Sequence, residues 1–155
     1  MAVERIMSGA QTGVDRAALD VALELGIPCG GWVPGGRIDE LGRIPERYPN
    51  LRETVSADFS ERTAANVRDS DGTLIISRGL LSGGSLHTWE VADQVGRICF
   101  HLDLNEHTIE DSAAVVIAWL DRTDIKVLNV AGPRASKDPG VHDRAVDLLR
   151  IVLKP

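Results

Sequence analysis

The sequence predicts an α/β fold in which a mainly parallel sheet lies between two layers of helices. Short apolar runs of strand length alternate along the chain with longer segments of helical periodicity, the pattern of repeated β-α-β units. Three of these strands end in turns that are rich in glycine. With 155 residues and 43% hydrophobic residues, the chain is most simply one globular domain over residues 1–155.

The first strand is expected at residues 5–8 and the first helix at residues 13–25. The apolar residues of this helix recur with a period of about 3.6, and Gly26 closes it. The turn between strand and helix reads Ser-Gly-Ala-Gln-Thr-Gly, and its small residues allow the backbone to approach a ligand or a neighbouring element closely. Thr12 is predicted to cap the helix, with Asp15 as an acidic variant of the capping box.

A second strand is expected at residues 27–33 and a short one at residues 51–56. The connection between them, residues 34–50, holds three prolines, three glycines and three arginines, which predicts a structured loop rather than a regular element. A connection of this length in a compact domain is usually functional or disordered. Its tyrosine, isoleucine and leucine side chains favour an ordered lid that these residues anchor.

The alternation continues through the second half of the chain. Ser60 is predicted to cap a helix that ends at about residue 70, and a later helix is expected to begin at Thr108 or Glu110 and to reach Leu120. The remaining expected elements are strands at 73–77, 97–102 and 127–130, and helices at 85–95 and 139–153.

The three glycine-rich turns, at residues 8–13, 78–85 and 131–137, are expected to meet at one edge of the sheet. The carboxyl ends of parallel strands share an edge, and α/β proteins bind their ligands there. Each turn precedes a helix, whose free N–H groups and partial positive charge favour an anion. One such turn is equally well explained by close packing, and its spacing matches neither the dinucleotide fingerprint nor the P-loop. Three turns together predict a pocket for an anion or a nucleotide-like ligand.

The residues predicted to contact this ligand are the glycines, small polar residues and arginines of the three turns. Residues 83–88 open a helix, so that N–H groups and hydroxyls point towards the sheet edge. Arg78 and Arg134 follow buried strands and carry planar guanidinium groups suited to an oxyanion. The complete predicted set is Gly9, Gln11, Thr12, Gly13, Arg78, Gly83, Gly84, Ser85, Thr88, Gly132, Arg134 and Ser136.

Charge and composition argue against several other classes of function. The net charge of −6 is unfavourable for general binding to nucleic acid or to a membrane surface. The sequence has no apolar run long enough for a membrane span and no signal-peptide pattern at its start, so we expect a cytoplasmic protein. Cys29 and Cys99 are expected to be buried thiols. The four histidines lack the spacing of metal ligands, so no metal site is predicted.

Several segments together resemble the putative molybdenum carrier family, a branch of the Rossmann-like SLOG superfamily that includes the Lonely Guy proteins. The matching segments are residues 8–20, 30–34, 44–49, 66–75, 83–88 and 128–137. Ala10 differs, because the family often has a second glycine there. The resemblance implies a Rossmann-like three-layer fold and a carrier or sensor that binds molybdate, molybdenum cofactor or a related phosphorylated heterocycle. The resemblance implies no other required cofactor. Because members of the superfamily commonly associate through their helices, it also implies a homo-oligomer.

The alternative is an enzyme of the Lonely Guy type, a phosphoribohydrolase that cleaves the N-glycosidic bond of a nucleoside monophosphate. Glu90 would then be the acidic catalytic residue. Lonely Guy proteins have two residues between their paired glycines and the threonine of the motif, with a glycine just before that threonine. Here three residues separate Gly84 from Thr88, and that third glycine is missing. We therefore expect binding of a small anionic ligand rather than turnover. A purely structural module is the third possibility.

Overall fold

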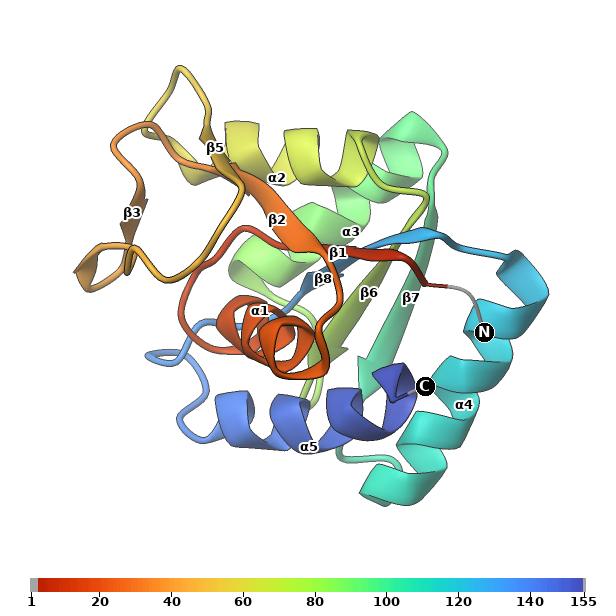
Figure 1. Cartoon of the computed structure of the whole chain (residues 1–155). Coiled ribbons are helices and arrows are strands. Elements are labelled where there is room, and N and C mark those ends of the chain that lie inside the picture. Colours follow the sequence, from red (N-terminus) through yellow and green to blue (C-terminus); the bar gives the residue numbers. More distant parts are fainter. Residues whose placement is uncertain (1–2, 155) are drawn as a thin grey trace.

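The computed structural model describes residues 3–154, which form three layers (Figure 1). The middle layer is a sheet of six strands in the order β5-β2-β1-β8-β6-β7, and every neighbouring pair in it is parallel. The strands of this sheet are β1 (Arg5–Met7), β2 (Cys29–Val33), β5 (Leu51–Glu53), β6 (Gly72–Ser77), β7 (Ile98–Asp103) and β8 (Val127–Ala131). The helices are α1 (Val14–Leu25), α2 (Phe59–Arg68), α3 (Gly83–Val95), α4 (Ile109–Thr123) and α5 (Val141–Leu153).

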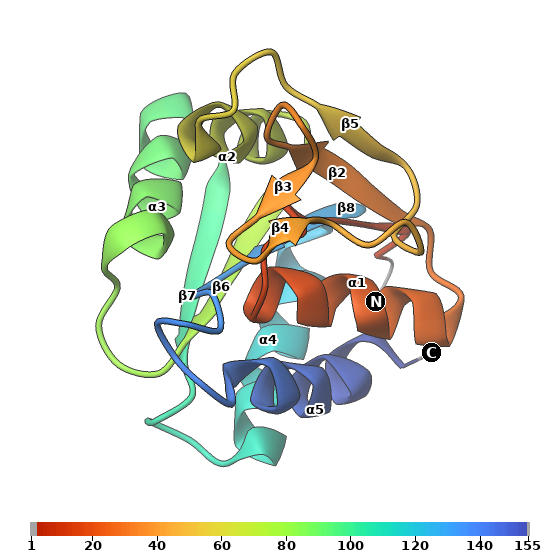
Figure 2. The same ribbon diagram turned by 90° about the vertical axis from the view of Figure 1, so that its left-hand side faces the viewer.

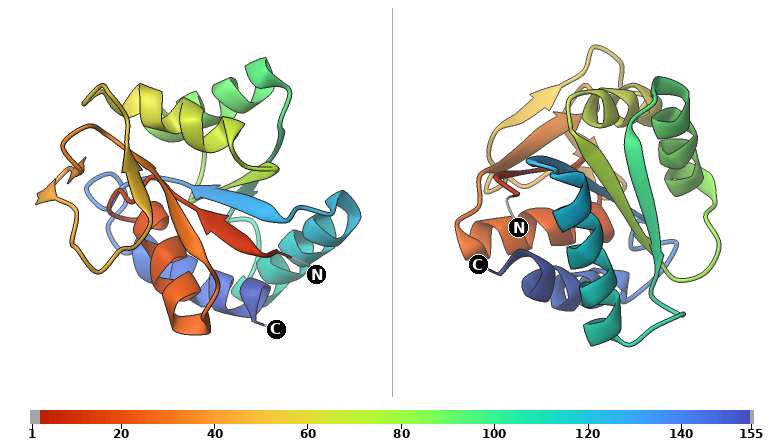
Figure 3. Two further views of the ribbon diagram at one scale, coloured as in Figure 1. Left: turned by 45° about the horizontal axis from the view of Figure 1, so that its top comes forward. Right: turned by 90° about the vertical axis from the view of Figure 1, so that its right-hand side faces the viewer.

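The chain starts near the centre of the sheet and reverses its direction of travel across it. It passes from β1 outward to β2 and β5, crosses to β6 and β7 on the other side, and returns with β8 between β1 and β6. Helices α1, α4 and α5 pack together on one face, and α2 and α3 cover the other (Figures 2 and 3). The predicted α/β fold, with a parallel sheet and helices on both faces, is confirmed.

The hydrophobic core lies mainly between the sheet and the layer of α1, α4 and α5. The inner strands are apolar because both of their faces are covered, as expected for a parallel sheet. Leu74, Ile76, Leu128 and Val130 are completely buried, together with Val14 of α1. Across residues 3–154, no helix combines the length and the apolar character needed to cross a membrane.

Two predicted helix caps are wrong, and local hydrogen bonding explains both. Helix α1 begins after Gly13 instead of Thr12, because the Thr12 hydroxyl is engaged elsewhere, with Glu40 and with the Ala135 N–H. Helix α2 is capped by Asp58, whose carboxylate accepts a bond of 3.0 Å from the N–H of Ser60, the residue predicted to be the cap. Carboxylates and hydroxyls are both good caps, so the sequence did not distinguish them.

Two other expected features are present, a helix cap at Thr108 and an ordered connection over residues 34–50. Thr108 caps α4 and accepts a bond of 3.1 Å from the Asp111 N–H. Residues 34–50 form an ordered connection, which contains a small antiparallel hairpin of β3 (Ile38–Asp39) and β4 (Gly42–Arg43). Ile44 and Tyr48 are buried and anchor this connection, whereas Leu41 is 84% exposed at the hairpin tip and anchors nothing.

Candidate functional site

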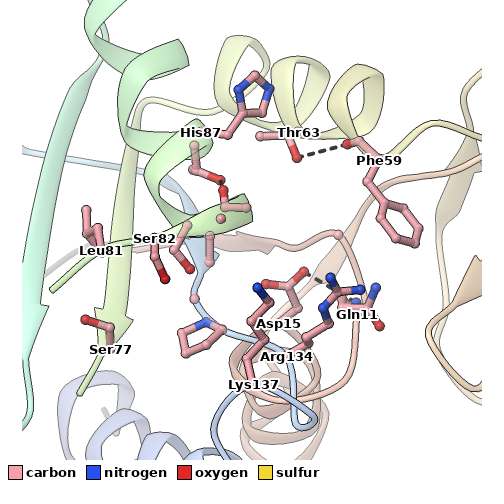
Figure 4. A pocket seen from close by; sticks show the side chains of 18 of the residues that line it. Gln11, Asp15, Phe59, Thr63, Ser77, Leu81, Ser82, His87, Arg134 and Lys137 are labelled. Atoms are coloured by element: carbon pink, nitrogen blue, oxygen red, sulfur yellow. Dashed lines mark hydrogen bonds between the residues drawn. The ribbon is translucent and has the colours of Figure 1, made fainter. Parts of the chain in front are cut away.

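A cavity of about 490 Å³ opens at the carboxyl ends of β1, β6 and β8, between the starts of α2 and α3 (Figure 4). The three glycine-rich turns all contribute to its lining, as the sequence predicted, and the beginning of α2 contributes a fourth segment. In Figure 4, Gln11, Asp15, Arg134 and Lys137 gather on one side of the cavity, and Phe59 and Thr63 of α2 lie across from them.

The amino terminus of α3 provides free backbone donors to this cavity. Its N-cap, Ser82, makes no side-chain capping bond, and the carbonyl of Ser82 is used only by the N–H of Leu86. Within residues 3–154, the N–H groups of Gly83, Gly84 and Ser85 have no hydrogen-bond partner. A Cβ atom on Gly84 would meet no atom within 4 Å, so the space in front of it is open. This is the arrangement in which a helix start receives an oxyanion.

Four cationic side chains line the cavity, and they differ in how far they are neutralised. Arg78 is engaged in an ion pair with Asp138 and donates a further bond of 2.9 Å to the Pro139 carbonyl. Lys137 is exposed at the mouth, and its Nζ lies 3.4 Å from the position that a Cβ on Gly83 would take. Arg62 and Arg134 each have a carboxylate oxygen at 3.9 Å, from Asp15 and Glu40 respectively. The positive charge that is most available to a ligand therefore comes from Lys137.

The cavity wall contains a buried pair of opposite charges that was not predicted from the sequence. The Nη1 atom of Arg62 on α2 lies 3.9 Å from Oδ2 of Asp15 on α1, and it donates a bond of 2.8 Å to the Gly9 carbonyl. A Cβ on Gly9 would come within 2.5 Å of the same nitrogen, so Gly9 is needed for this approach. No local pattern signals the pair, because the partners come from different helices.

Burial changes the titration of Asp15. Loss of solvent around its carboxyl raises the pKa to about 6, against the smaller opposing effect of the Arg62 charge. A buried carboxyl with a raised pKa in a cavity wall is a typical feature of functional sites. The sequence pattern predicted a capping role for Asp15 and gave no sign of its burial in the cavity wall.

Most of the predicted contact residues reach the cavity, and a few do not. Those in its lining are Gly9, Gln11, Arg78, Gly83, Gly84, Ser85, Thr88, Gly132 and Arg134. Gly13 instead packs against the turn after β8, where a Cβ would lie 2.3 Å from the Pro133 carbonyl oxygen. Thr12 and Ser136 bind the side chain of Glu40. Glu90 is exposed on α3 and lies outside the lining, so the structure does not bring this proposed catalytic acid to the cavity.

One serine in the lining has a histidine partner that the sequence did not reveal. The Ser77 hydroxyl lies 2.6 Å from Nε2 of His101 on the neighbouring strand β7, and it donates a bond of 3.0 Å to the Gly79 carbonyl. His101 itself is outside the lining. The pair therefore fixes the turn after β6. Among residues 3–154 there is no cluster of three or more His, Cys, Asp or Glu side chains suited to a metal ion.

Replacing Asp15 by Asn is expected to stabilise the fold at pH 7 by about 3 kcal/mol, since a raised pKa of about 6 means that the folded state disfavours the charged carboxylate. In the wild type this group favours folding below pH 4, and its contribution is lost as the pH rises from about 4 to about 6. Burial lowers the pKa of His142, but its hydrogen bonds to Asp143 and Asp20 raise it above the usual value, and this effect is the same in both proteins.

Urea denaturation of both proteins at pH 4, 5, 6 and 7 tests this. The stability difference between variant and wild type should grow up to pH 6 and then level off. A difference that does not vary with pH would contradict a raised pKa of Asp15.

Comparison with known proteins identifies the family of this chain. The model of the circularly permutated YpsA SLOG family matches residues 6–153. The crystal structure of a protein named Putative molybdenum carrier protein, from Syntrophus aciditrophicus SB, is 52% identical and superposes with a TM-score of 0.96. The similarity covers 98% of this chain and 96% of that one. A search of the curated proteins finds no match. The chain belongs to the circularly permutated YpsA SLOG family, which agrees with the resemblance to the putative molybdenum carrier family of the SLOG superfamily found in its sequence.

Proposed function

We propose that the cavity binds an oxyanion or a phosphorylated heterocycle, and that the protein carries or senses molybdate, molybdenum cofactor or a related ligand. The observation that carries this proposal is the uncapped amino terminus of α3, whose free N–H groups face open space beside Lys137. Preorganised N–H groups and a nearby cation replace the hydration shell of an anion without further rearrangement. The name of the 52% identical relative is consistent with such a ligand.

The size and lining of the cavity favour a ligand larger than a bare oxyanion. Its volume of about 490 Å³ lies in the range of about 300–1,000 Å³ that is usual for small-molecule and cofactor sites. Phe59 provides an apolar surface across from the charged wall, and the Arg62 guanidinium lies 5.2 Å from the centre of its ring. An anionic group at α3 with a flat ring near Phe59 would use both parts of the cavity.

A thermal-shift panel of molybdate, tungstate, phosphate, sulfate and AMP at matched ionic strength tests the proposal. A ligand present at 100 times its dissociation constant stabilises the folded protein by about 2.7 kcal/mol, which is readily measured. We expect molybdate and tungstate to raise the melting temperature more than sulfate does. Equal, negligible shifts with all five compounds and with isolated molybdenum cofactor would overturn the proposal.

A shift with AMP alone would favour the phosphoribohydrolase alternative, and release of free adenine would then be measured. The position of Glu90 outside the cavity leaves that alternative without the acid that the sequence suggested. The cytoplasmic location and the homo-oligomeric state remain predictions, to be tested by fractionation and by light scattering.

A further inference from the structure

Two residues that the sequence predicted to bind an anion do hold one, but it comes from this chain. Thr12 and Ser136 donate hydrogen bonds from their hydroxyls to the carboxylate of Glu40, and the N–H of Ser136 donates a third, of 3.2 Å. Nε of Arg134 lies 3.9 Å from the same carboxylate. We call these three residues, Thr12, Arg134 and Ser136, the Glu40 nest.

The donors of the nest are fixed by their own partners. The Thr12 oxygen accepts a bond of 3.1 Å from the Ala135 N–H, so its hydrogen points towards Glu40. Thr12 is buried, whereas Ser136 is exposed, so the nest has a rigid inner wall and an opening to solvent. These contacts, with the hydrogen bond of Ser136 first, hold the pKa of Glu40 below its usual value. Two hydroxyls, one N–H and one guanidinium also suit a tetrahedral oxyanion.

The position of Glu40 in the chain makes its carboxylate displaceable. Glu40 and Leu41 form the turn between β3 and β4, at the tip of the small hairpin. Asp39, the residue just before this turn, is held separately by a bond of 2.6 Å from Arg16. The side chain of Glu40 can therefore leave the nest while the hairpin remains attached.

The nest adjoins the main cavity through shared residues. Arg134 lines the cavity and also belongs to the nest. Gln11 lines the cavity (Figure 4). Its side-chain oxygen accepts bonds of 2.9 Å from the Glu40 N–H and 3.0 Å from the Thr12 N–H. An anion in the nest would thus lie next to a ligand in the cavity.

We propose that the Glu40 nest is a second oxyanion subsite, which Glu40 occupies as an internal anion until phosphate, molybdate or the second anionic group of a larger ligand displaces it. Because the Glu40 carboxylate competes with the external anion for the nest, it sets the anion concentration that is needed for binding. This subsite is separate from the oxyanion position at the start of α3, and its existence does not require that position to bind.

Titration calorimetry with inorganic phosphate tests the proposal, with Glu46→Ala as the matched control. Glu46 lies in the same connection, residues 34–50, is exposed and bonds only to Arg43 in the described part of the chain. Glu40→Ala should bind one more equivalent of phosphate than the wild type, or bind it at least tenfold more tightly. Adding Ser136→Ala to Glu40→Ala should abolish this gain, and Glu46→Ala should behave as the wild type.

Circular dichroism and thermal melting establish that each variant is folded. If Glu40→Ala does not fold, the isosteric Glu40→Gln replaces it, with a smaller gain because the amide still occupies the nest. Phosphate binding identical to that of the wild type, in stoichiometry and affinity, would overturn the proposal. If the wild type binds no phosphate and the Glu40 variant binds one equivalent, the result would support this subsite and count against phosphate binding in the main cavity.

Discussion

Gly132→Ala is expected to lower the free energy of unfolding by about 3 kcal/mol, because the added methyl group has no room. A Cβ there would lie 2.3 Å from the Ile76 carbonyl oxygen and 2.6 Å from Cγ2 of Val14. Ile76 belongs to an inner strand, and Val14 is fully buried at the start of α1, so neither can move without disturbing the core. The midpoint of urea denaturation should fall with little change in slope.

Gly84→Ala is the matched stability control for this substitution. Gly84 is also a glycine at the cavity, but a Cβ on it meets nothing within 4 Å, and alanine is the better helix former. Its unfolding free energy should equal that of the wild type or slightly exceed it. Loss of less than 1 kcal/mol in Gly132→Ala would show that the turn after β8 can move away from the added methyl group.

The same Gly84→Ala variant is expected to bind molybdate or phosphate about a hundredfold more weakly than the wild type, or worse. Its methyl group would occupy the open space in front of the free α3 N–H groups. The loss of two charge-assisted hydrogen bonds to the anion costs about 3 kcal/mol of binding free energy, which corresponds to a factor of about 100 in affinity. Titration calorimetry at fixed ionic strength measures the effect.

Glu90→Gln is the control for binding, since Glu90 lies on the same helix outside the cavity and is exposed. It should bind the anion as the wild type does. Unchanged affinity in Gly84→Ala would show that the anion does not rest on α3, and the proposed function would then lose its main support.

The fold was predictable from the sequence because it depends on periodicity and on the places where strands end. The apolar run 73–77 and the glycines that follow it were enough to place β6 and the start of α3 at the cavity. The location of the cavity followed from a general property of parallel sheets, that strand ends and helix starts share an edge.

The contacts between distant side chains were not predictable. The approach of Arg62 to Asp15, and that of Glu40 to Ser136, each join segments that no local pattern connects. The role of a glycine was equally hidden. Gly13 and Gly132 allow close packing, whereas Gly84 leaves open space, and only the surroundings of each residue distinguish the two cases.

The return of β8 to the centre of the sheet has a consequence for synthesis of the protein. Ile6 of β1 pairs with Leu128 of β8, and β6 pairs with the opposite side of β8, so residues 127–131 join the two halves of the sheet. A nascent chain on the ribosome holds β1 and β6 with an unpaired edge each until residues 127–131 have emerged. Open, apolar strand edges favour aggregation, so we expect the chain to be most prone to it during this interval.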